Sequence, residues 1–335
     1  MWAIENSTDF VVDGVGITDR DGRNAWVVVV KATFLFDDTG VLVPAPKEKQ
    51  VEFSLLPQYR GEDGQSSLLY EADSCPAKPG TDVVLNADAW APGGNPTSRM
   101  NVSLRIGDRI KTLVVSGRRE YQRQLSGLLE PSPPLPFVQQ PIEYEGAHGG
   151  HDTSNPDPTK QRYHASNPVG AGIVRGAGER APNIEHAGNG RHPNPAGFGA
   201  IASFWHPRTT LHGTYDAAWF KDRKPLLPAD FDPRHYHCAP VDQQFEAPLR
   251  GGEAIGLENL TPDGRRVFRL PKHYFGFTTI ARGEAIEHRG KLDTVIIEPS
   301  KGRVIMSWKS QLDCHKDFDY IDFTRVAEKE YVESA

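Results

Sequence analysis

The four residues His235-Tyr236-His237-Cys238 form a concentrated set of side chains that could ligate a metal. On a β-strand, His235 and His237 would project to the same face, where both could bind zinc or copper. No third ligand stands at a diagnostic spacing, and Asp232-Pro233-Arg234 just before the set favours a surface turn. The sequence therefore predicts neither a bound metal nor a cofactor.

A second set of candidate residues is acidic and could support glycoside hydrolysis, which uses paired carboxylates. These acids stand in sequence rich in Gly and Pro, where carboxylates also cap turns and hold loop backbone. A hydrolase or carbohydrate-active enzyme is the alternative function class, although the sequence contains no G-x-S-x-G, H-E-x-x-H or P-loop motif. The set comprises Glu143, Glu145, Glu185, Asp216, Asp230, Asp232 and Asp242.

Aromatic residues in the same part of the sequence admit two interpretations. They could form a small core that holds an irregular segment, because large aromatic side chains stabilise mainly through burial. Some could instead be exposed anchors for a partner, since Trp, Tyr and Arg dominate binding hot spots. The residues concerned are Trp205, Tyr215, Trp219, Phe220, Phe231, Tyr236 and Phe245.

Residues 144–243 are rich in short sequence motifs that join Gly or Pro to Asn, Asp, Glu or an aromatic residue. Gly permits positive φ, Pro fixes φ, and short amides and carboxylates bond nearby backbone groups. This central section is therefore expected to be folded but non-repetitive. The motifs of this section include Tyr144-Glu145-Gly146, Asn167-Pro168-Val169-Gly170, Pro182-Asn183-Ile184-Glu185, Pro195-Ala196-Gly197-Phe198-Gly199, Gly213-Thr214-Tyr215-Asp216 and Ala239-Pro240-Val241-Asp242-Gln243.

In the order of these motifs, the sequence resembles a family of type VI secretion accessory proteins. That family is a domain of unknown function encoded beside spike proteins and toxic effectors. The resemblance implies a non-enzymatic adaptor or chaperone that binds a secretion effector and helps load it onto the spike complex. The implied partners are the effector and a spike or spike-tip protein. Motifs outside the central section extend the resemblance over residues 6–271. They include Lys31-Ala32-Thr33-Phe34, Lys78-Pro79-Gly80-Thr81-Asp82-Val83 and Asn259-Leu260-Thr261-Pro262-Asp263-Gly264.

We expect residues 167–170, 195–199 and 213–219 to pack together and to form or support the partner-binding surface. These segments combine backbone-fixing residues with large aromatic residues, and the family resemblance is dense there. The predicted site residues are Asn167, Pro168, Trp205, Arg208, Tyr215, Asp216, Trp219, Asp230 and Asp242.

The sequence predicts mainly β structure, with antiparallel sheets in a sandwich- or barrel-like arrangement and few short helices. Residues 100–106 alternate apolar and polar side chains, and Gly107-Asp108 then joins them to residues 109–115 as a hairpin. One short helix is expected from Asp216, as N-cap, to Arg223. Turns are expected at Asp37-Asp38-Thr39-Gly40, Thr261-Pro262-Asp263-Gly264 and Pro299-Ser300-Lys301-Gly302.

The Pro-rich residues 130–136 are expected to form an extended connector that lies outside any sheet. This connector is the best candidate for a domain boundary. It divides the chain into an N-terminal β domain (1–130), a loop-rich central section (131–250) and a C-terminal β section (251–335). The C-terminal section is expected to pack with the N-terminal part as one unit.

Charge and composition limit the partners and the compartment. The 335 residues carry a net charge of −6, so a basic surface would have to be local, and no nucleic-acid binding is predicted. The first ten residues lack the apolar run of a secretory signal, and residues 25–30 are too few to span a bilayer. Cytoplasmic residence without membrane insertion is therefore expected. Cys75, Cys238 and Cys314 lack C-x-x-C spacing, which favours buried or incidental thiols over a disulfide framework.

Overall fold

The structure is a computed structural model that describes residues 3–173, 175–188, 194–314, 318 and 321–329. Within these residues β-strands dominate, and the single α-helix, α1 (Ala217–Asp222), has six residues. The prediction of a mainly β fold with few short helices is confirmed. Frequent Gly and Pro explain this outcome, because both disfavour helix interiors. None of the described helices is long and apolar enough to cross a membrane.

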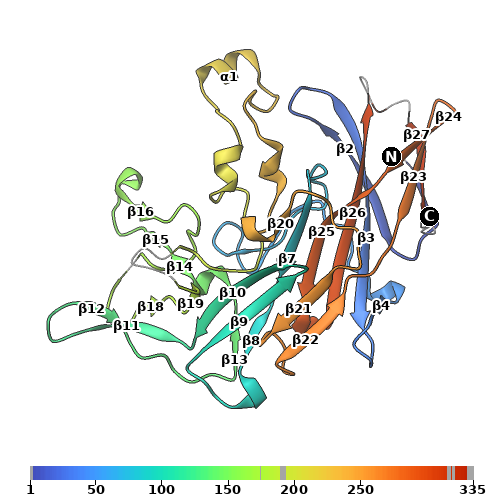
Figure 1. Ribbon diagram of the computed structural model, residues 1–335. Coiled ribbons are helices and arrows are strands. Elements are labelled where there is room, and N and C mark those ends of the chain that lie inside the picture. Colours follow the sequence, from blue (N-terminus) through green and yellow to red (C-terminus); the bar gives the residue numbers. More distant parts are fainter. Residues whose placement is uncertain (1–2, 174, 189–193, 315–317, 319–320, 330–335) are drawn as a thin grey trace.

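The largest sheet has the order β2–β3–β26–β25–β7–β20, with β4 paired to β3 (Figure 1). Its neighbours run antiparallel apart from β25 and β7, which are parallel and place Thr294 opposite Asp82. Strands from the two ends of the sequence therefore lie side by side. The bounds are β2 (Val11–Thr18), β3 (Asn24–Phe36), β4 (Leu42–Pro44), β7 (Thr81–Leu85), β20 (Gln244–Phe245), β25 (Lys291–Glu298) and β26 (Arg303–Cys314).

A second sheet has the order β19–β10–β9–β21–β22 and takes strands from all three sections of the sequence. Its centre is the predicted hairpin, in which Ile106 pairs with Arg109 and Met100 with Val115. Gly107 has a φ of +55°, which the tight turn requires and which glycine adopts without strain. The bounds are β9 (Arg99–Ile106), β10 (Arg109–Ser116), β19 (Ile184–His186), β21 (Ala254–Glu258) and β22 (Arg265–Arg269).

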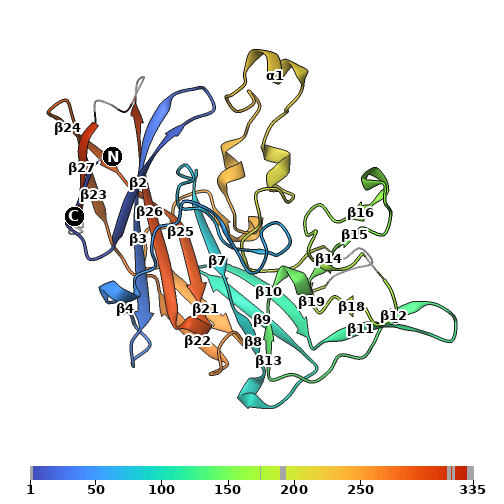
Figure 2. The same cartoon turned by 180° about the vertical axis from the view of Figure 1, so that it is seen from behind.

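A third sheet, in the order β1–β27–β23–β24, joins residues from the two ends of the described chain. β1 runs parallel to β27, so that Ala3 lies opposite Phe323. Figure 2 shows this sheet beside the largest one, at the end of the molecule where both termini lie. The bounds are β1 (Ala3–Asn6), β23 (Phe275–Ala281), β24 (Glu284–Arg289) and β27 (Ile321–Glu328).

Short ladders and 3-10 turns make up most of the remaining regular structure. The ladders are β11 (Arg119–Arg123) with β12 (Leu129–Pro131) and β18 (Arg180–Ala181), β8 (Asp88–Trp90) with β13 (Gln139–Pro141), β14 (His148–Gly149) with β17 (Ala171–Gly172), β15 (His151–Asp152) with β16 (Arg162–Tyr163), and β5 (Gln58–Tyr59) with β6 (Leu68–Tyr70). The turns are η1 (Lys47–Lys49), η2 (Pro92–Gly94), η3 (Tyr144–Gly146), η4 (Pro158–Lys160), η5 (Arg208–Leu211), η6 (Pro233–Tyr236), η7 (Val241–Gln243) and η8 (Pro299–Lys301).

The Pro-rich connector differs from the prediction in one respect. Pro131 lies in β12, where it pairs with Tyr121, so the expectation that this segment avoids every sheet is wrong at its first proline. β12 is an edge strand, and an edge position tolerates a residue without an N–H. Further along, Leu135 donates its N–H to the carbonyl of Arg118, which holds the connector against β11.

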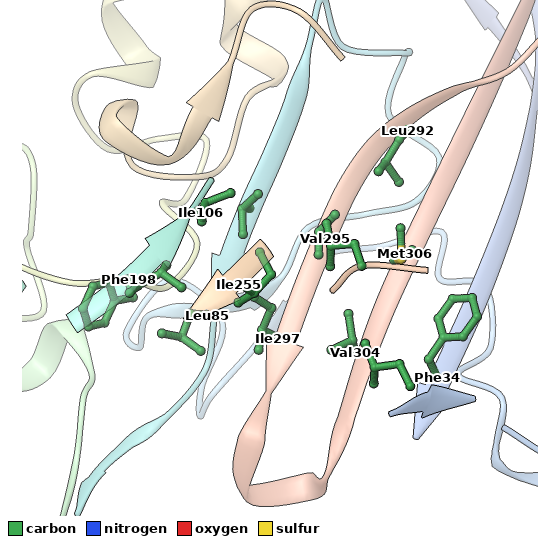
Figure 3. Packing of buried hydrophobic residues seen from close by; sticks show 14 of the residues in the cluster. Phe34, Leu85, Ile106, Phe198, Ile255, Leu292, Val295, Ile297, Val304 and Met306 are labelled. Carbon is green, nitrogen blue, oxygen red and sulfur yellow. The ribbon is translucent and has the colours of Figure 1, made fainter. Parts of the chain in front are cut away.

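A hydrophobic core fills the space between the two largest sheets (Figure 3). Ile106 and Ile255 of the second sheet lie beside Leu85, Val295 and Ile297 of the first, and all five are at most 3% exposed. Burying one such side chain contributes roughly 1.5–3 kcal/mol. Both sheets keep open edges, so the arrangement is the sandwich-like one of the two that the sequence allowed.

The other face of the largest sheet is also buried, but it is partly polar. Strands β3, β26 and β7 place Lys31, Lys309 and Asp82 on this face, and each is at most 6% exposed. Apolar residues of the same face, among them Val84 and Ile305, belong to a second, smaller hydrophobic cluster. The segments that cover this face come mainly from residues 50–78 and from the central section.

Candidate functional site

Tyr144, the first residue of η3, brings together two of the three segments that were predicted to pack. Its backbone carbonyl accepts a hydrogen bond from Asn167 Nδ2 at 2.8 Å, and its hydroxyl donates to the carbonyl of Gly199 at 3.3 Å. Gly197 lies so close that a Cβ there would come within 2.8 Å of the Tyr144 ring. Residues 167–170 and 195–199 therefore meet around one buried aromatic side chain.

Trp205 packs edge-on against Tyr144, with ring centroids 5.7 Å apart, and has no exposed surface. It belongs to the second hydrophobic cluster with Val84, Ile296 and Ile305, which attach the central section to the largest sheet. For Trp205 the core interpretation is therefore correct, and the anchor interpretation is wrong. Asn167 is equally buried, and its backbone carbonyl accepts the N–H of Gly170 across a turn that contains Pro168.

A group of buried charges lies beside this cluster. Lys78 Nζ is 2.9 Å from a carboxylate oxygen of Asp82 and 3.3 Å from one of Asp293. The same ammonium donates to the hydroxyl of Thr294 at 2.6 Å. Lys309 Nζ lies 3.9 Å from Asp293 and donates to the carbonyl of Cys75 at 2.8 Å. Buried charges are tolerated when they are paired and hydrogen-bonded, as they are here.

The charges shift one another's pKa values in opposite directions. Burial alone would raise the pKa of Asp82, but the Lys78 ammonium and the His237 hydrogen bond outweigh it and hold that pKa well below its usual value. Burial also opposes ionisation of Lys78, yet Asp293 and Asp82 raise its pKa well above normal. Lys78 and Asp82 therefore stay ionised at neutral pH.

These charges fix the covering segments to the sheet. Asp82 accepts the backbone N–H of Cys238 at 2.7 Å and bonds His237 Nδ1 at 2.6 Å. Arg208, which is 3% exposed, is 2.5 Å from Glu71. It also donates through Nε to the carbonyl of His235 at 2.9 Å.

The chemistry open to this cluster is limited by space. The adjoining cavity measures about 20 Å³, enough for roughly one water molecule. Cys238 lines it as a free thiol, and burial raises the pKa of that thiol, so the nucleophilic thiolate is disfavoured. The geometry suits a structural role rather than covalent catalysis.

The candidate metal ligands do not act together. Pro233–Tyr236 form the 3-10 turn η6, so the strand alternative is wrong and the turn alternative is confirmed. His235 Nδ1 faces the carbonyl of Arg208 at 2.8 Å, whereas His237 Nδ1 faces Asp82. Among the residues that the structure describes, no three His, Cys, Asp or Glu side chains are grouped to hold a metal ion.

The third predicted segment lies elsewhere, on a projecting arm. We define the arm as residues 206–237, which leave the body and return to it with α1 at their outer end (Figures 1 and 2). The outgoing and returning halves of the arm are joined where the N–H of Asp232 donates to the carbonyl of Leu211 at 2.9 Å. Asp230 adds a second link, because its carboxylate accepts the N–H and the hydroxyl of Thr214. Residues 213–219 thus bond within the arm, and the expectation that they join the Tyr144 segments is wrong.

The outer end of the arm is held by specific contacts. Asp216 caps α1 as predicted, since its carboxylate accepts the N–H of Trp219 at 2.8 Å. Trp219 is half-buried, and its Nε1 donates to the carbonyl of Leu226 at 2.8 Å. Tyr215 packs on Trp219 with ring centroids 4.7 Å apart and remains 50% exposed. Phe220 is 63% exposed. A fixed tip therefore presents aromatic surface to solvent.

The arm also contacts the body through the loop between β2 and β3. Arg223 Nη2 donates to the carbonyl of Arg20 at 2.5 Å, and Arg20 Nη1 donates to the carbonyl of Phe231 at 3.3 Å. Phe231 is buried in the returning half of the arm, where its ring lies 5.4 Å from that of Tyr236. These contacts, together with Arg208 and His237 at the base, limit the freedom of the arm.

Asp242 lies apart from both the segments around Tyr144 and the arm. Its carboxylate lies 2.8 Å from Lys111 Nζ, and that ammonium also donates to the side chain of Gln243 at 2.9 Å. Gln243 in turn donates to the carbonyls of Val83 and Phe198. Asp242 thus helps fix η7 between the two largest sheets.

The remaining acids of the hydrolase hypothesis also have structural partners. Glu145 accepts the N–H and the hydroxyl of Ser67, at 2.7 and 2.8 Å. Glu143 pairs with Arg60, Glu185 with Arg119, and Asp232 with Arg234. Glu145 and Asp232 thus hold loop backbone, since Asp232 also accepts the N–H of Arg234, whereas Glu143 and Glu185 form ion pairs.

Sequence reasoning missed the buried ionic cluster. Lys78, Asp82, Asp293 and Lys309 were not among the predicted site residues, because isolated charged residues are mostly exposed. One feature of the sequence could have pointed to the cluster. Lys78 and Asp82 belong to the motif Lys78-Pro79-Gly80-Thr81-Asp82-Val83, which is part of the family resemblance.

The fold and these contacts define a β-sheet protein whose long irregular section is fixed to one sheet by buried ion pairs and carries a projecting arm. Residues 21–309 match the model of a family described as an uncharacterized protein conserved in bacteria (DUF2169), and the chain belongs to this family. Neither a curated protein nor a solved structure matches the chain.

Proposed function

We propose that this protein is a non-enzymatic adaptor or chaperone of a type VI secretion system. It binds an effector in the cytoplasm and helps load that effector onto the spike complex. The resemblance of its sequence motifs to those of type VI secretion accessory proteins motivates the assignment to this secretion system. The arm supplies the physical basis for the binding role.

The observation that carries the proposal is the aromatic tip of the arm. Tyr215 and Phe220 are 50% and 63% exposed, although Phe220 lies in the capped helix α1 and Tyr215 packs on Trp219 of that helix. Exposed aromatic residues on a held element are typical of binding hot spots, because few degrees of freedom are lost when a partner covers them. An apolar segment of the effector would pack on these rings.

The buried ionic cluster contributes indirectly. Arg208 and His237 stand at the two ends of the arm, where Glu71 and Asp82 hold them. A tip whose base is fixed in this way needs little reorganisation on binding, and preorganisation raises affinity.

Co-expression tests the proposal. The protein would be produced with the effector and the spike protein encoded nearest to it, purified through a tag on the effector, and analysed by size-exclusion chromatography. We expect a stoichiometric complex with the effector. Failure to form a complex with either partner, together with turnover on a panel of polysaccharides, would instead favour the hydrolase class.

A further inference from the structure

An open pocket of about 890 Å³ lies where the third sheet meets the largest one. It is formed by β23, the end of β24, the start of β25, and residues 247–250 that run alongside. None of its residues belongs to the arm. Its volume falls within the range of roughly 300–1,000 Å³ that ligand sites usually have.

The floor of this pocket is apolar and closely packed. Leu292, Trp308 and Phe275 are 2%, 5% and 8% exposed, and they come from three different strands. Phe275 and Trp308 pack edge to face with ring centroids 5.0 Å apart. His273 stacks on Phe275 at 6.2 Å and 9°, which extends the aromatic surface. Such a floor can accept an aliphatic or aromatic group.

The rim is cationic, in contrast to the net charge of −6 of the whole chain. It carries the exposed side chains of Arg250, Arg289, Lys291 and Lys329. In the described part of the chain, only Lys329 has an acidic partner, Glu287 at 3.9 Å.

Three carboxylates beside the pocket, Glu253, Glu287 and Glu328, keep their negative charge, but none of them lines the pocket. Glu328 bonds His273 Nδ1 at 2.5 Å, and Glu253 accepts the backbone N–H of Arg250 at 2.8 Å. His288 bonds Ser310, and burial lowers its pKa to about 4, so it is neutral at pH 7. Four rim cations against these three carboxylates leave a small excess of positive charge, and the charged residues that line the pocket itself are all cationic.

We infer that this pocket binds an acidic peptide segment of a partner protein, with one aromatic or aliphatic side chain entering the pocket and flanking carboxylates meeting the rim. The cations come from separate segments around the opening, so carboxylates spaced along a peptide can each reach one of them. A compact anion such as phosphate would contact only part of this set. The inference concerns a second surface and does not depend on the role of the arm.

Fluorescence anisotropy with a labelled synthetic peptide tests this inference. The probe contains Glu residues on both sides of a single Phe, and matched peptides replace Glu by Gln or Phe by Ala. The double variant Arg289→Glu/Lys291→Glu should weaken binding of the Glu–Phe probe by at least about tenfold, because attraction becomes repulsion at two positions. Both changed peptides should also bind more weakly to the unchanged protein.

The matched control is Arg105→Glu/Arg265→Glu, which alters the net charge equally but lies on the second sheet. The affinity of this control for the probe should stay within about twofold, because neither residue lines the pocket and salt screens exposed charges. Thermal melting checks that both double variants fold. Equal losses in both variants, or no probe binding to the unchanged protein, would overturn the inference. Inorganic phosphate that displaces the probe would identify a simple anion site and would also contradict it.

Discussion

The two tryptophans of the central section are expected to differ in their effect on stability. Trp205 is fully buried against Tyr144, whereas Trp219 is half-buried at the tip of the arm. Trp205→Ala should lower the free energy of unfolding by about 3–5 kcal/mol, because it removes a large core side chain. Trp219→Ala should lower it far less, as its surroundings are local. Chemical denaturation measures both values, and equal losses would contradict these positions.

The N-cap of α1 gives a second prediction at the residue scale. Asp216→Ala removes the acceptor for the Trp219 N–H and should destabilise the helix start by about 1 kcal/mol. Hydrogen exchange of the Trp219 amide reports this local change. The control is Asp222→Ala at the last residue of the same helix, which should leave that amide protected. Protection unchanged in Asp216→Ala would argue against the cap.

At the residue scale, local chemistry was readable from the sequence and long-range partners were not. The cap at Asp216 was predicted because a capping acid needs only the next three residues. The burial of Trp205 depends on Tyr144 and on strands from other parts of the chain, so sequence left its two interpretations open.

At the scale of elements, the buried charges between β7, β25 and the arm should be important for stability. Asp82→Asn leaves Lys78 with one fewer anionic partner and should cost about 3–5 kcal/mol, the usual penalty for breaking a buried pair. Asp232→Asn is the control, because its partner Arg234 is exposed, and it should cost less than about 1 kcal/mol. Urea denaturation of the two variants provides the comparison.

The same variant has a predicted pH dependence. The folded-state pKa values of Asp82 and Asp293 lie below those of unfolded carboxyl groups, which are about 3.9. Their contribution to stability is therefore complete above that pH and declines as the pH falls through the folded-state values. Asp82→Asn should flatten the loss of stability in acid. An unchanged slope below pH 4, about the unfolded value, would contradict the role assigned to this carboxylate.

Elements with local signals were predicted well, and those without were not. The hairpin of β9 and β10 follows from alternation plus Gly107, and the turns that end at Gly264 and Gly302 close with the expected hydrogen bonds. β7 is buried on both faces, so it shows no alternation, and its parallel pairing with β25 spans more than 200 residues of sequence. The two-residue ladders of the central section have no periodicity to read.

At the scale of the whole molecule, each of the two largest sheets needs strands that lie far apart in the sequence. β7 pairs with β25, and β9 pairs with β21. A fragment of residues 1–250 lacks β21–β27 and should not fold, because much of the main hydrophobic core is then missing. Circular dichroism and urea titration of this fragment provide the test. A cooperative unfolding transition would show that the N-terminal residues form an independent domain.

The central claim is that the aromatic tip of the arm binds the effector. The most direct measurement is the affinity of the co-encoded effector for Tyr215→Ala/Phe220→Ala, by isothermal titration calorimetry. The control is Leu125→Ala/Leu128→Ala, which removes two exposed apolar side chains between β11 and β12. We predict a loss of at least about 2 kcal/mol for the arm variant, the scale of a hot spot, with unchanged melting temperature and no loss for the control. Unchanged affinity in the folded arm variant, or the same loss in the control, would contradict the account.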